Sequence, residues 1–408
     1  MTCGRAHPLG TLYVYLTEGC NLRCRHCWIQ PKFQSGAQVY GSLDFDLFRH
    51  VVDQALPLGL SSVKLTGGEP LLHPRIADIV HYAGGKGLHI GMETNGVLCT
   101  PSLAEEIASS RSPHVSVSLD GADAATHEWV RGVSGSFHAA LQGIRNLVGA
   151  GLRPQVIMTI MKRNAEQVVP VIRLAESLGA GSVKFNLLQP TARGEKMHEA
   201  GDNLPIERLV ALGRQVENKL ARSSRIPLFY SHPAAFRPLG SMFDDGGGCA
   251  ACGIFGILGV LASGAYALCG IGETVPEFVF GHAAKDRLEE VWNETPMLRE
   301  IRDGLPRRLE GICGRCLMKT VCLGGCIAQN YYRERNLWAG HWYCEDAFGK
   351  GLFPESRLRP DVSLSKSCLL YTSDAADDLL CVDLGGRRII KKKNKTKTNT
   401  KTNTQHTD

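Results

Sequence analysis

The chain has 408 residues, of which 43% are hydrophobic and 21% are charged, and it contains 15 cysteines. This length suffices for two or three domains with at least one large core. The longest apolar runs fall short of the roughly 20 residues that a membrane span requires, and Met1–Gly10 lacks the pattern of a secretory signal. So many thiols without such a signal indicate metal ligands in a reducing cytosol. The composition therefore predicts a cytoplasmic protein and excludes membrane proteins, secreted disulfide scaffolds and wholly disordered chains.

The formal net charge of +6 could suggest nucleic-acid binding, but half of it comes from residues 368–408. This segment could be a solvated polybasic tail or a phosphate-binding arm. Back-translation of Cys368–Asp378 and Cys381–Lys393 favours a third interpretation, because it gives nucleotides that resemble a transposase-type sequencing adapter followed by a homopolymer. We therefore expect residues 368–408 to be adapter read-through without order, and the authentic C-terminus to be missing. No nucleic-acid partner is expected.

Short apolar runs alternate with amphipathic segments from Thr11 to about Asn186. The alternation predicts parallel βα units, arranged as a partial barrel or a doubly wound sheet. An α/β fold with a partial, TIM-like (βα)6 barrel fits the pattern, and reactive groups then belong on loops at the carboxyl ends of the strands. The predicted strands are Thr11–Leu16, Ser62–Thr66, His89–Glu93, His114–Leu119, Gln155–Ile160 and Val183–Asn186. The predicted helices are Phe45–Leu56, Arg75–Gly84, Leu103–Ser109, Phe137–Gly149 and Ala165–Leu178.

The remaining chain changes character after this barrel. We expect the barrel to occupy residues 1–200 and a helical linker, with a helix over Pro205–Leu220, to occupy 201–245. Residues 246–348 are rich in cysteine and poor in periodicity, so metal centres are expected to cross-link them. Residues 349–367 form a C-terminal remainder.

The first cysteine cluster is Cys20, Cys24 and Cys27, spaced C-x3-C-x2-C directly after the first predicted strand. Three thiolates can surround one four-iron cube but leave one iron without a cysteine. Such an open position can bind a substrate or cofactor. The alternative is a structural zinc site completed by His26 or a remote cysteine.

Gly67-Gly68-Glu69-Pro70 follows the second predicted strand. Two glycines allow the backbone to approach a ligand closely, and Glu69 offers an acceptor for an ammonium group. Alone, this is an ordinary turn sequence. Together with C-x3-C-x2-C it resembles the radical S-adenosylmethionine (radical SAM) superfamily. The resemblance implies a 4Fe–4S cluster on the three cysteines, an open iron that chelates the methionine moiety of SAM, and a GGEP segment that binds its amino group. One-electron reduction of SAM would then release a 5′-deoxyadenosyl radical that abstracts hydrogen from carbon.

Further motifs match this superfamily in order: Thr94-Asn95-Gly96, Ser118-Leu119-Asp120-Gly121, Arg131-Gly132 and Gly135-Ser136-Phe137. By resemblance, Ser118 and Arg131 contact the ribose or carboxylate of SAM, since an arginine fork matches a carboxylate. The alternative for Arg131 is a surface loop cation. His26 stands where the superfamily has an aromatic residue, and Leu188 and Pro190 are candidates for the adenine side. The expected SAM-binding residues are His26, Gly67, Gly68, Glu69, Asn95, Ser118, Arg131 and Leu188.

A second cysteine cluster resembles the SPASM extension of radical SAM enzymes. The spacing is Cys252-x11-Gly264-x4-Cys269, then Cys313-x2-Cys316-x5-Cys322-x3-Cys326 and finally Cys344, with Cys249 outside the pattern. Two zinc ribbons are the alternative. The resemblance implies two auxiliary 4Fe–4S clusters, the first on Cys249, Cys252, Cys269 and Cys326 and the second on Cys313, Cys316, Cys322 and Cys344. Without Cys249, the first would have an open iron for substrate. Cys3 and Cys99 are expected to be ordinary thiols.

Members of this family chiefly modify peptides and proteins, so the resemblance implies a maturase that forms a thioether or carbon–carbon cross-link in a ribosomally made peptide. An alternative is a sulfatase-maturing enzyme, which forms a formylglycine. Such members carry an aspartate that acts as a base directly after the second auxiliary-cluster cysteine, whereas Cys269 of this chain is followed by Gly270. Segment Cys252–Glu273 is similar to maturases of SynChlorMet-type cassettes. Expected partners are a precursor peptide or protein and an electron donor such as ferredoxin or flavodoxin. Because the N-terminus is short, we also expect either a separate leader-peptide-binding protein or direct contact of the peptide with the SPASM domain. No membrane partner is expected, and no catalytic base can be assigned. The remaining alternative is an iron–sulfur electron carrier or scaffold that does not cleave SAM.

Overall fold

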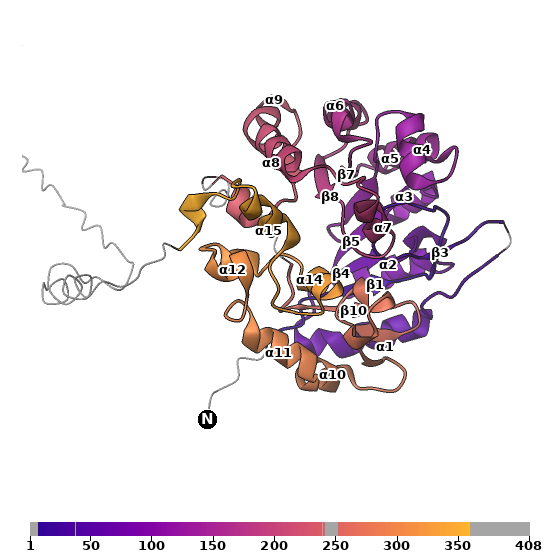
Figure 1. Cartoon of the computed structure of the whole chain (residues 1–408). Helices are drawn as coiled ribbons and strands as arrows, with labels where there is room; N and C mark the ends of the chain where they lie inside the picture. Colours follow the sequence, from indigo (N-terminus) through magenta and orange to yellow (C-terminus); the bar gives the residue numbers. More distant parts are fainter. Residues whose placement is uncertain (1–6, 37, 239, 241–251, 360–408) are drawn as a thin grey trace, which may run out of the picture. The chain divides into compact units, whose positions relative to one another are not determined.

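The computed structural model describes residues 7–36, 38–238, 240 and 252–359. The described residues up to Leu358 form one compact unit around a ten-stranded sheet, ordered β12-β11-β10-β1-β4-β5-β6-β7-β8-β9 (Figure 1). Its strands are β1 (Thr11–Tyr15), β4 (Ser62–Thr66), β5 (His89–Thr94), β6 (His114–Ser118), β7 (Gln155–Ile160), β8 (Ser182–Leu187), β9 (Leu228–Tyr230), β10 (Ile257–Val260), β11 (Ala265–Ala267) and β12 (Val279–His282). Strands β2 (Gly19–Cys20) and β3 (Lys32–Phe33) form a separate pair. Neighbouring strands from β10 to β9 run parallel, and β11 and β12 add an antiparallel edge.

The helices before the second cysteine cluster are α1 (Phe45–Ala55), α2 (Ile76–Gly85), α3 (Pro101–Ser109), α4 (Ala124–Arg131), α5 (Ser136–Gly149), α6 (Val168–Ser177), α7 (Arg193–Glu199) and α8 (Ile206–Gln215), which continues through a π-helical turn (Val216–Leu220) into α9 (Ala221–Ser223). The later helices are α10 (Leu288–Glu294), α11 (Pro296–Gly304), α12 (Gly311–Arg315), α13 (Lys319–Cys322), α14 (Ile327–Glu334) and α15 (Trp342–Gly349).

The predicted α/β architecture is confirmed, and each of the six predicted strands agrees with the structure to within one residue at its ends. The agreement follows from burial: β7 is buried at five successive positions, as expected for a strand covered on both faces. Helices α4 and α7 were not predicted. Helix α4 is short and polar, but Asp123 caps its start by accepting from Thr126 N–H at 2.8 Å, and Gly132 ends it with φ +72°.

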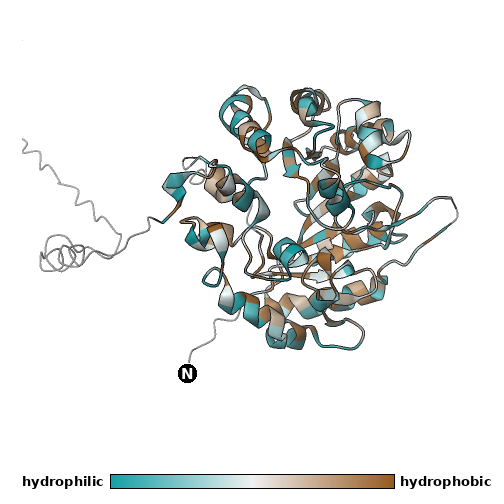
Figure 2. Cartoon of the chain, in the orientation of Figure 1, coloured by the Kyte–Doolittle hydropathy of each residue, from teal (hydrophilic) through white to brown (hydrophobic). Residues whose placement is uncertain are grey.

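The cysteine-rich segment packs directly on the barrel. Strand β10 lies beside β1, with Thr11 opposite Ile257, and Phe278, Trp292 and Tyr343 belong to the same hydrophobic cluster as the barrel strands. Brown, hydrophobic residues accordingly line the interior strands in Figure 2, while the outer helices show teal stretches. The structure thus supplies apolar burial for a segment whose sequence predicts little core of its own.

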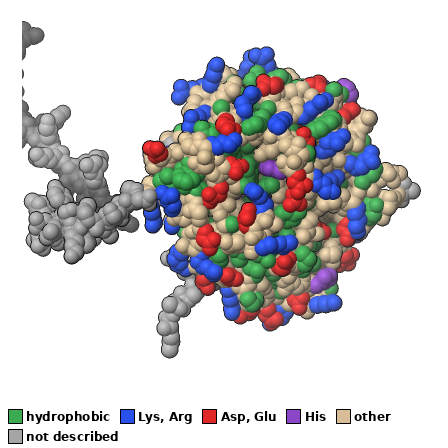
Figure 3. All heavy atoms as spheres, viewed as in Figure 1, with side chains coloured by type: hydrophobic (Ala, Val, Ile, Leu, Met, Phe, Trp, Pro, Cys, Tyr) green, Lys and Arg blue, Asp and Glu red, His purple; other side chains and the backbone are tan. Residues whose placement is uncertain are grey.

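On the face drawn in Figure 3, acidic and basic side chains are intermixed, and neither charge sign forms a patch. None of the helices within the described ranges is long and apolar enough to cross a membrane. Cys3, Cys249 and the predicted read-through segment 368–408 lie outside the described residues.

Candidate functional site

The loop that carries the first three cysteines leaves the carboxyl end of β1 and is held by the Gly67–Glu69 turn at the end of β4. Gly68 N–H donates to Thr17 O at 2.9 Å, and Glu69 N–H donates to Gly19 O at 3.0 Å. A Cβ at residue 68 would collide with the Gly19 carbonyl, and Gly67 has φ +134°. The two glycines therefore let two backbones meet, which fixes the start of the cysteine loop.

Glu69 is almost fully buried and is held at the carboxyl end of β5. Its Oε1 accepts from the Thr94 hydroxyl at 2.6 Å and from Leu71 N–H at 3.1 Å, and its Oε2 accepts from Asn95 N–H at 2.8 Å. Burial raises the pKa of Glu69 to about 7, although these three hydrogen bonds oppose the rise. The Asn95 side-chain amide in turn donates to Asn21 Oδ1 at 2.7 Å, which joins this turn to the cysteine loop.

A cavity of about 360 Å³ brings most of the predicted SAM-binding residues together with the first cysteine cluster. Its lining includes Cys20, Cys24, Cys27, His26, Gly67, Gly68, Glu69, Asn95, Ser118 and Arg131. Leu188 is not among the lining residues. It is fully buried in a separate small cluster with Val130, Met161 and Met197, while its neighbours Leu187 and Gln189 line the cavity.

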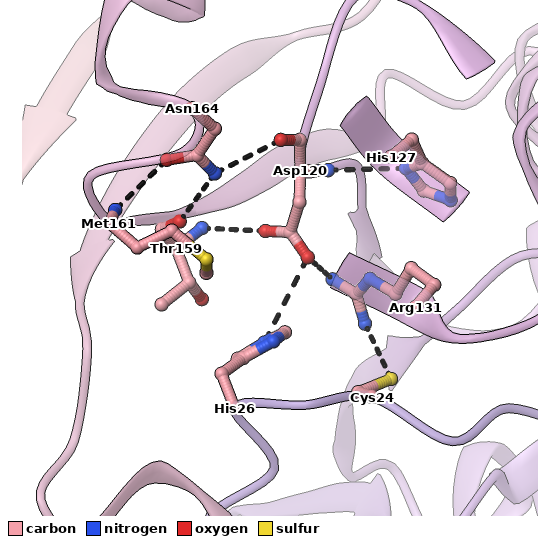
Figure 4. Close-up of polar contacts among 8 residues, drawn as sticks. All are labelled: Cys24, His26, Asp120, His127, Arg131, Thr159, Met161 and Asn164. Carbon is pink, nitrogen blue, oxygen red and sulfur yellow. Dashed lines mark hydrogen bonds and ion pairs between the residues drawn. The ribbon is translucent and has the colours of Figure 1, made fainter. Parts of the chain in front are cut away.

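Arg131, the last residue of α4, is buried rather than a surface cation. Its guanidinium Nη2 lies 2.7 Å from Asp120 Oδ2, and Nη1 donates to Cys24 Sγ at 3.5 Å (Figure 4). Burial tends to raise the pKa of Asp120, but Arg131 and His26 reverse this and leave it below its usual range. His26 Nε2 lies 3.8 Å from the same Asp120 oxygen, and burial lowers the pKa of His26 to about 4. Asp120 belongs to a motif that matches the superfamily, but no role was predicted for it.

The cysteines of the second cluster separate into two sets in space. Cys252, Cys269 and Cys326 line the same cavity as Cys20, Cys24 and Cys27. Cys313, Cys316, Cys322 and Cys344 instead line a small cavity of about 10 Å³ together with Pro233 and Phe353. Both sets correspond to the groups predicted for the auxiliary clusters, apart from Cys249.

The donor chemistry of these sites fits iron–sulfur clusters. Every cysteine within the described ranges is a free thiol. Burial raises the pKa of Cys20, Cys24, Cys252, Cys269 and Cys326, and a hydrogen bond from Cys344 lowers the pKa of Cys313. Among the described residues, no three His, Cys, Asp or Glu side chains are arranged to hold a single metal ion. A 4Fe–4S cluster requires a different arrangement of ligands, because each thiolate binds a different iron atom.

Sequence reasoning missed the polar floor of the cavity. Lys64 Nζ on β4 lies 2.6 Å from Glu93 Oε1 on β5, and its ammonium group lies 5.0 Å from the Tyr13 ring centroid. All three line the cavity. Alternate residues of a strand point to the same face of the sheet. Polar residues at such positions on neighbouring parallel strands could therefore have been predicted to lie together.

The chain matches two family models: "Radical SAM superfamily" over residues 14–175 and the SPASM model, "Iron-sulfur cluster-binding domain", over residues 249–317. The AdoMet-dependent heme synthase of Methanosarcina barkeri is 31% identical over 345 residues, covering 81% of this chain and 94% of the relative. The mycofactocin maturase MftC of Mycobacterium ulcerans is 28% identical over 373 residues, covering 85% and 90%.

Solved structures share the fold at low identity. Streptococcus suis SuiB bound to precursor peptide SuiA superposes with a TM-score of 0.65 at 17% identity, covering 83% of this chain and 76% of that one. The enzyme anSMEcpe with bound AdoMet gives 0.63 at 17% identity, covering 83% and 97%. With both cysteine motifs, the sheet and the matching families in agreement, the chain belongs to the radical SAM superfamily and is an enzyme of its SPASM-containing branch.

Proposed function

We propose that this enzyme is a peptide maturase that uses SAM to remove hydrogen from a peptide substrate and form a thioether or carbon–carbon cross-link. Cys20, Cys24 and Cys27 would hold the SAM-binding 4Fe–4S cluster, with the Gly67–Glu69 turn beside it. The bound cluster and SAM would supply the 5′-deoxyadenosyl radical. Two auxiliary clusters, an external electron donor such as ferredoxin or flavodoxin and a separate leader-peptide-binding protein complete the proposal.

The observation that carries the proposal is the shared cavity. One space of about 360 Å³ is lined by the first cysteine set and by Cys252, Cys269 and Cys326. A substrate held there would lie between the site where hydrogen is removed and a second redox centre. Cross-link formation removes two hydrogen atoms from a peptide, one of which leaves in 5′-deoxyadenosine and the other as a proton and an electron, so a nearby electron acceptor suits this chemistry. The likeness to MftC and to the fold of SuiB supports a peptide substrate.

The sulfatase-maturing alternative is less well supported. Gly270 occupies the position of the expected aspartate, and a Cβ there would collide with the Tyr15 ring and stand 2.6 Å from its hydroxyl oxygen. Tyr15 is itself almost fully buried. A carboxylate base at position 270 would therefore require Tyr15 to move.

A second candidate function is radical chemistry on an iron porphyrin. It is favoured by the 31% identity to the heme synthase of M. barkeri, which extends over 94% of that relative. The same cavity would then receive the porphyrin edge, with Lys64 near its floor as a cation for a carboxylate.

The experiment compares two substrates with the full, reconstituted chain, SAM and dithionite under anaerobic conditions. One sample receives candidate precursor peptides, taken from any short open reading frames found next to the gene, and the other receives an iron porphyrin, Fe-coproporphyrin III. A peptide maturase is expected to remove two hydrogens from the peptide, measured by mass spectrometry, with matching formation of 5′-deoxyadenosine and no change in the porphyrin.

A changed porphyrin with an unchanged peptide would overturn the peptide proposal in favour of the second candidate. The Cys24→Ala variant is the control, because it removes one cysteine of the first set and should abolish either reaction.

A further inference from the structure

The loop of the first cysteine set is clamped by the end of helix α4. Arg23 N–H donates to Arg131 O at 3.0 Å, and Arg25 N–H donates to Val130 O at 2.9 Å. Gly132 has φ +72°, and a Cβ there would lie 2.7 Å from Arg23 O. These backbone contacts fix the position of the Arg131 main chain relative to Cys24.

The side chain of Arg131 is fixed as firmly as its backbone. It is 7% exposed, and its two terminal nitrogens point to different partners, Nη2 to Asp120 Oδ2 at 2.7 Å and Nη1 to Cys24 Sγ at 3.5 Å (Figure 4). The third nitrogen, Nε, has no hydrogen-bond partner among the described residues. Because both terminal nitrogens already have partners, the fork is oriented toward the cysteine sulfur.

Asp120 is held in turn by β7 and by the loop that follows it. Thr159 N–H donates to Asp120 Oδ1 at 2.8 Å, and the Asn164 side-chain amide donates to Asp120 O at 3.0 Å. The residue is fully buried. With Oδ1 bound to the backbone, Oδ2 has a fixed direction, toward Arg131 and His26.

We infer that Asp120 is a positioning residue that holds the Arg131 guanidinium against Cys24 Sγ, and that this fixed cation raises the reduction potential of the cluster bound by Cys20, Cys24 and Cys27. The inference rests on the proposed function for its cluster. When the cluster takes up one electron its negative charge increases, and a hydrogen bond or positive charge at a ligand sulfur stabilises that reduced form. Residues that orient the hydrogen-bond partner of a metal ligand also influence the reduction potential of the metal site.

The test is reduction at controlled potential, followed by electron paramagnetic resonance, in the full reconstituted chain without SAM. The signal of this cluster is identified in separate samples as the one that changes when SAM is added. The remaining iron–sulfur signals serve as an internal reference. Arg131→Gln should lower the ratio of reduced to oxidised cluster at a fixed potential by about tenfold, which is about 59 mV for one electron. Arg131→Lys should restore part of the shift.

Asp120→Asn distinguishes positioning from simple charge neutralisation by the sign of its effect. If Asp120 positions Arg131, the guanidinium leaves the sulfur and the potential falls, as in Arg131→Gln. If Asp120 only offsets the charge of Arg131, removal of its negative charge raises the potential. The double variant should match Arg131→Gln alone, because Asp120 acts through Arg131.

The matched control is Arg145→Gln on α5, which removes an exposed cation outside the cysteine loop and α4 and should therefore leave the potential unchanged. If Asp120→Asn does not assemble the cluster, Arg131→Gln decides the claim of a tuning cation, and an unchanged potential there overturns it. A rise in potential for Asp120→Asn overturns the positioning role. Failure of the proposed function would be seen separately, as absence of any SAM-responsive signal.

Discussion

The carbonyl group of Gly19 occupies the space where a Cβ of residue 68 would stand, so the cysteine loop and the Gly67–Glu69 turn touch backbone to backbone. The hydrogen bond from Glu69 N–H to Gly19 O, at 3.0 Å, spans the same contact. The Gly-Gly pair was expected to bring the backbone close to a ligand. In the structure it also brings the turn close to the residue that precedes Cys20, so one motif builds both sides of the site.

Gly68→Ala tests this contact. The added methyl group must push the Gly19–Cys20 backbone away, and overpacking of this kind costs about 1–3 kcal/mol. We expect a lower free energy of unfolding in urea and less iron bound after reconstitution. Gly85→Ala in α2 is the control, because a Cβ there meets no atom within 4 Å and helical alanine is favoured over glycine. Equal stability and iron content in both variants would contradict the role of Gly68.

Glu69 should make the stability of the iron-free chain depend on pH. Burial raises its pKa from 4.5 to about 7, so between these values the folded chain binds more protons than the unfolded chain. The free energy of unfolding should therefore fall as the pH rises from about 4.5 to about 7, by up to about 3 kcal/mol. Urea unfolding of the reduced, iron-free chain across this range measures it.

Glu69→Gln should flatten that pH dependence, while Glu105→Gln at an exposed position should leave it unchanged. A wild-type profile with the same slope as Glu69→Gln would show that the buried carboxyl group does not titrate in this window.

The second auxiliary cluster can be distinguished from the other two clusters by the iron content of a variant that lacks one of its cysteines. Cys344 lines the small cavity with Cys313, Cys316 and Cys322, away from the large one. The cysteine count gives about 12 irons per chain for three four-iron clusters. Cys344→Ser should lower this to about eight, measured by iron analysis, while 5′-deoxyadenosine formation continues. Loss of all iron, or of none, would contradict the assignment of this cysteine to its own cluster.

The sequence predicted the strands well because buried parallel strands show as apolar runs of the right length, as in Gln155–Ile160. Spacing and resemblance also placed Cys313, Cys316, Cys322 and Cys344 in one group, and these four residues line one small cavity. These properties are local, or follow from the order of motifs along the chain.

Properties that depend on tertiary packing were not accessible in this way. The burial of Arg131 follows from contact between the end of α4 and the cysteine loop, residues more than a hundred positions apart. The Asp123 and Gly132 caps were the available signal for that helix. Leu188 was expected on the adenine side, but beyond the end of β8 strand alternation no longer fixes which way a side chain points, and Leu188 lies in its own apolar cluster.

The central claim is that Cys20, Cys24 and Cys27 share one cluster at which SAM is cleaved. The most direct measurement is 5′-deoxyadenosine formed from SAM by the reconstituted, dithionite-reduced chain, compared among wild type, Cys24→Ala and Cys99→Ala. Cys99 is buried and does not line either cavity, and burial raises its pKa to about 11. We predict product from the wild type and Cys99→Ala and none from Cys24→Ala. Undiminished product from Cys24→Ala, or none from the iron-loaded wild type, would contradict the account.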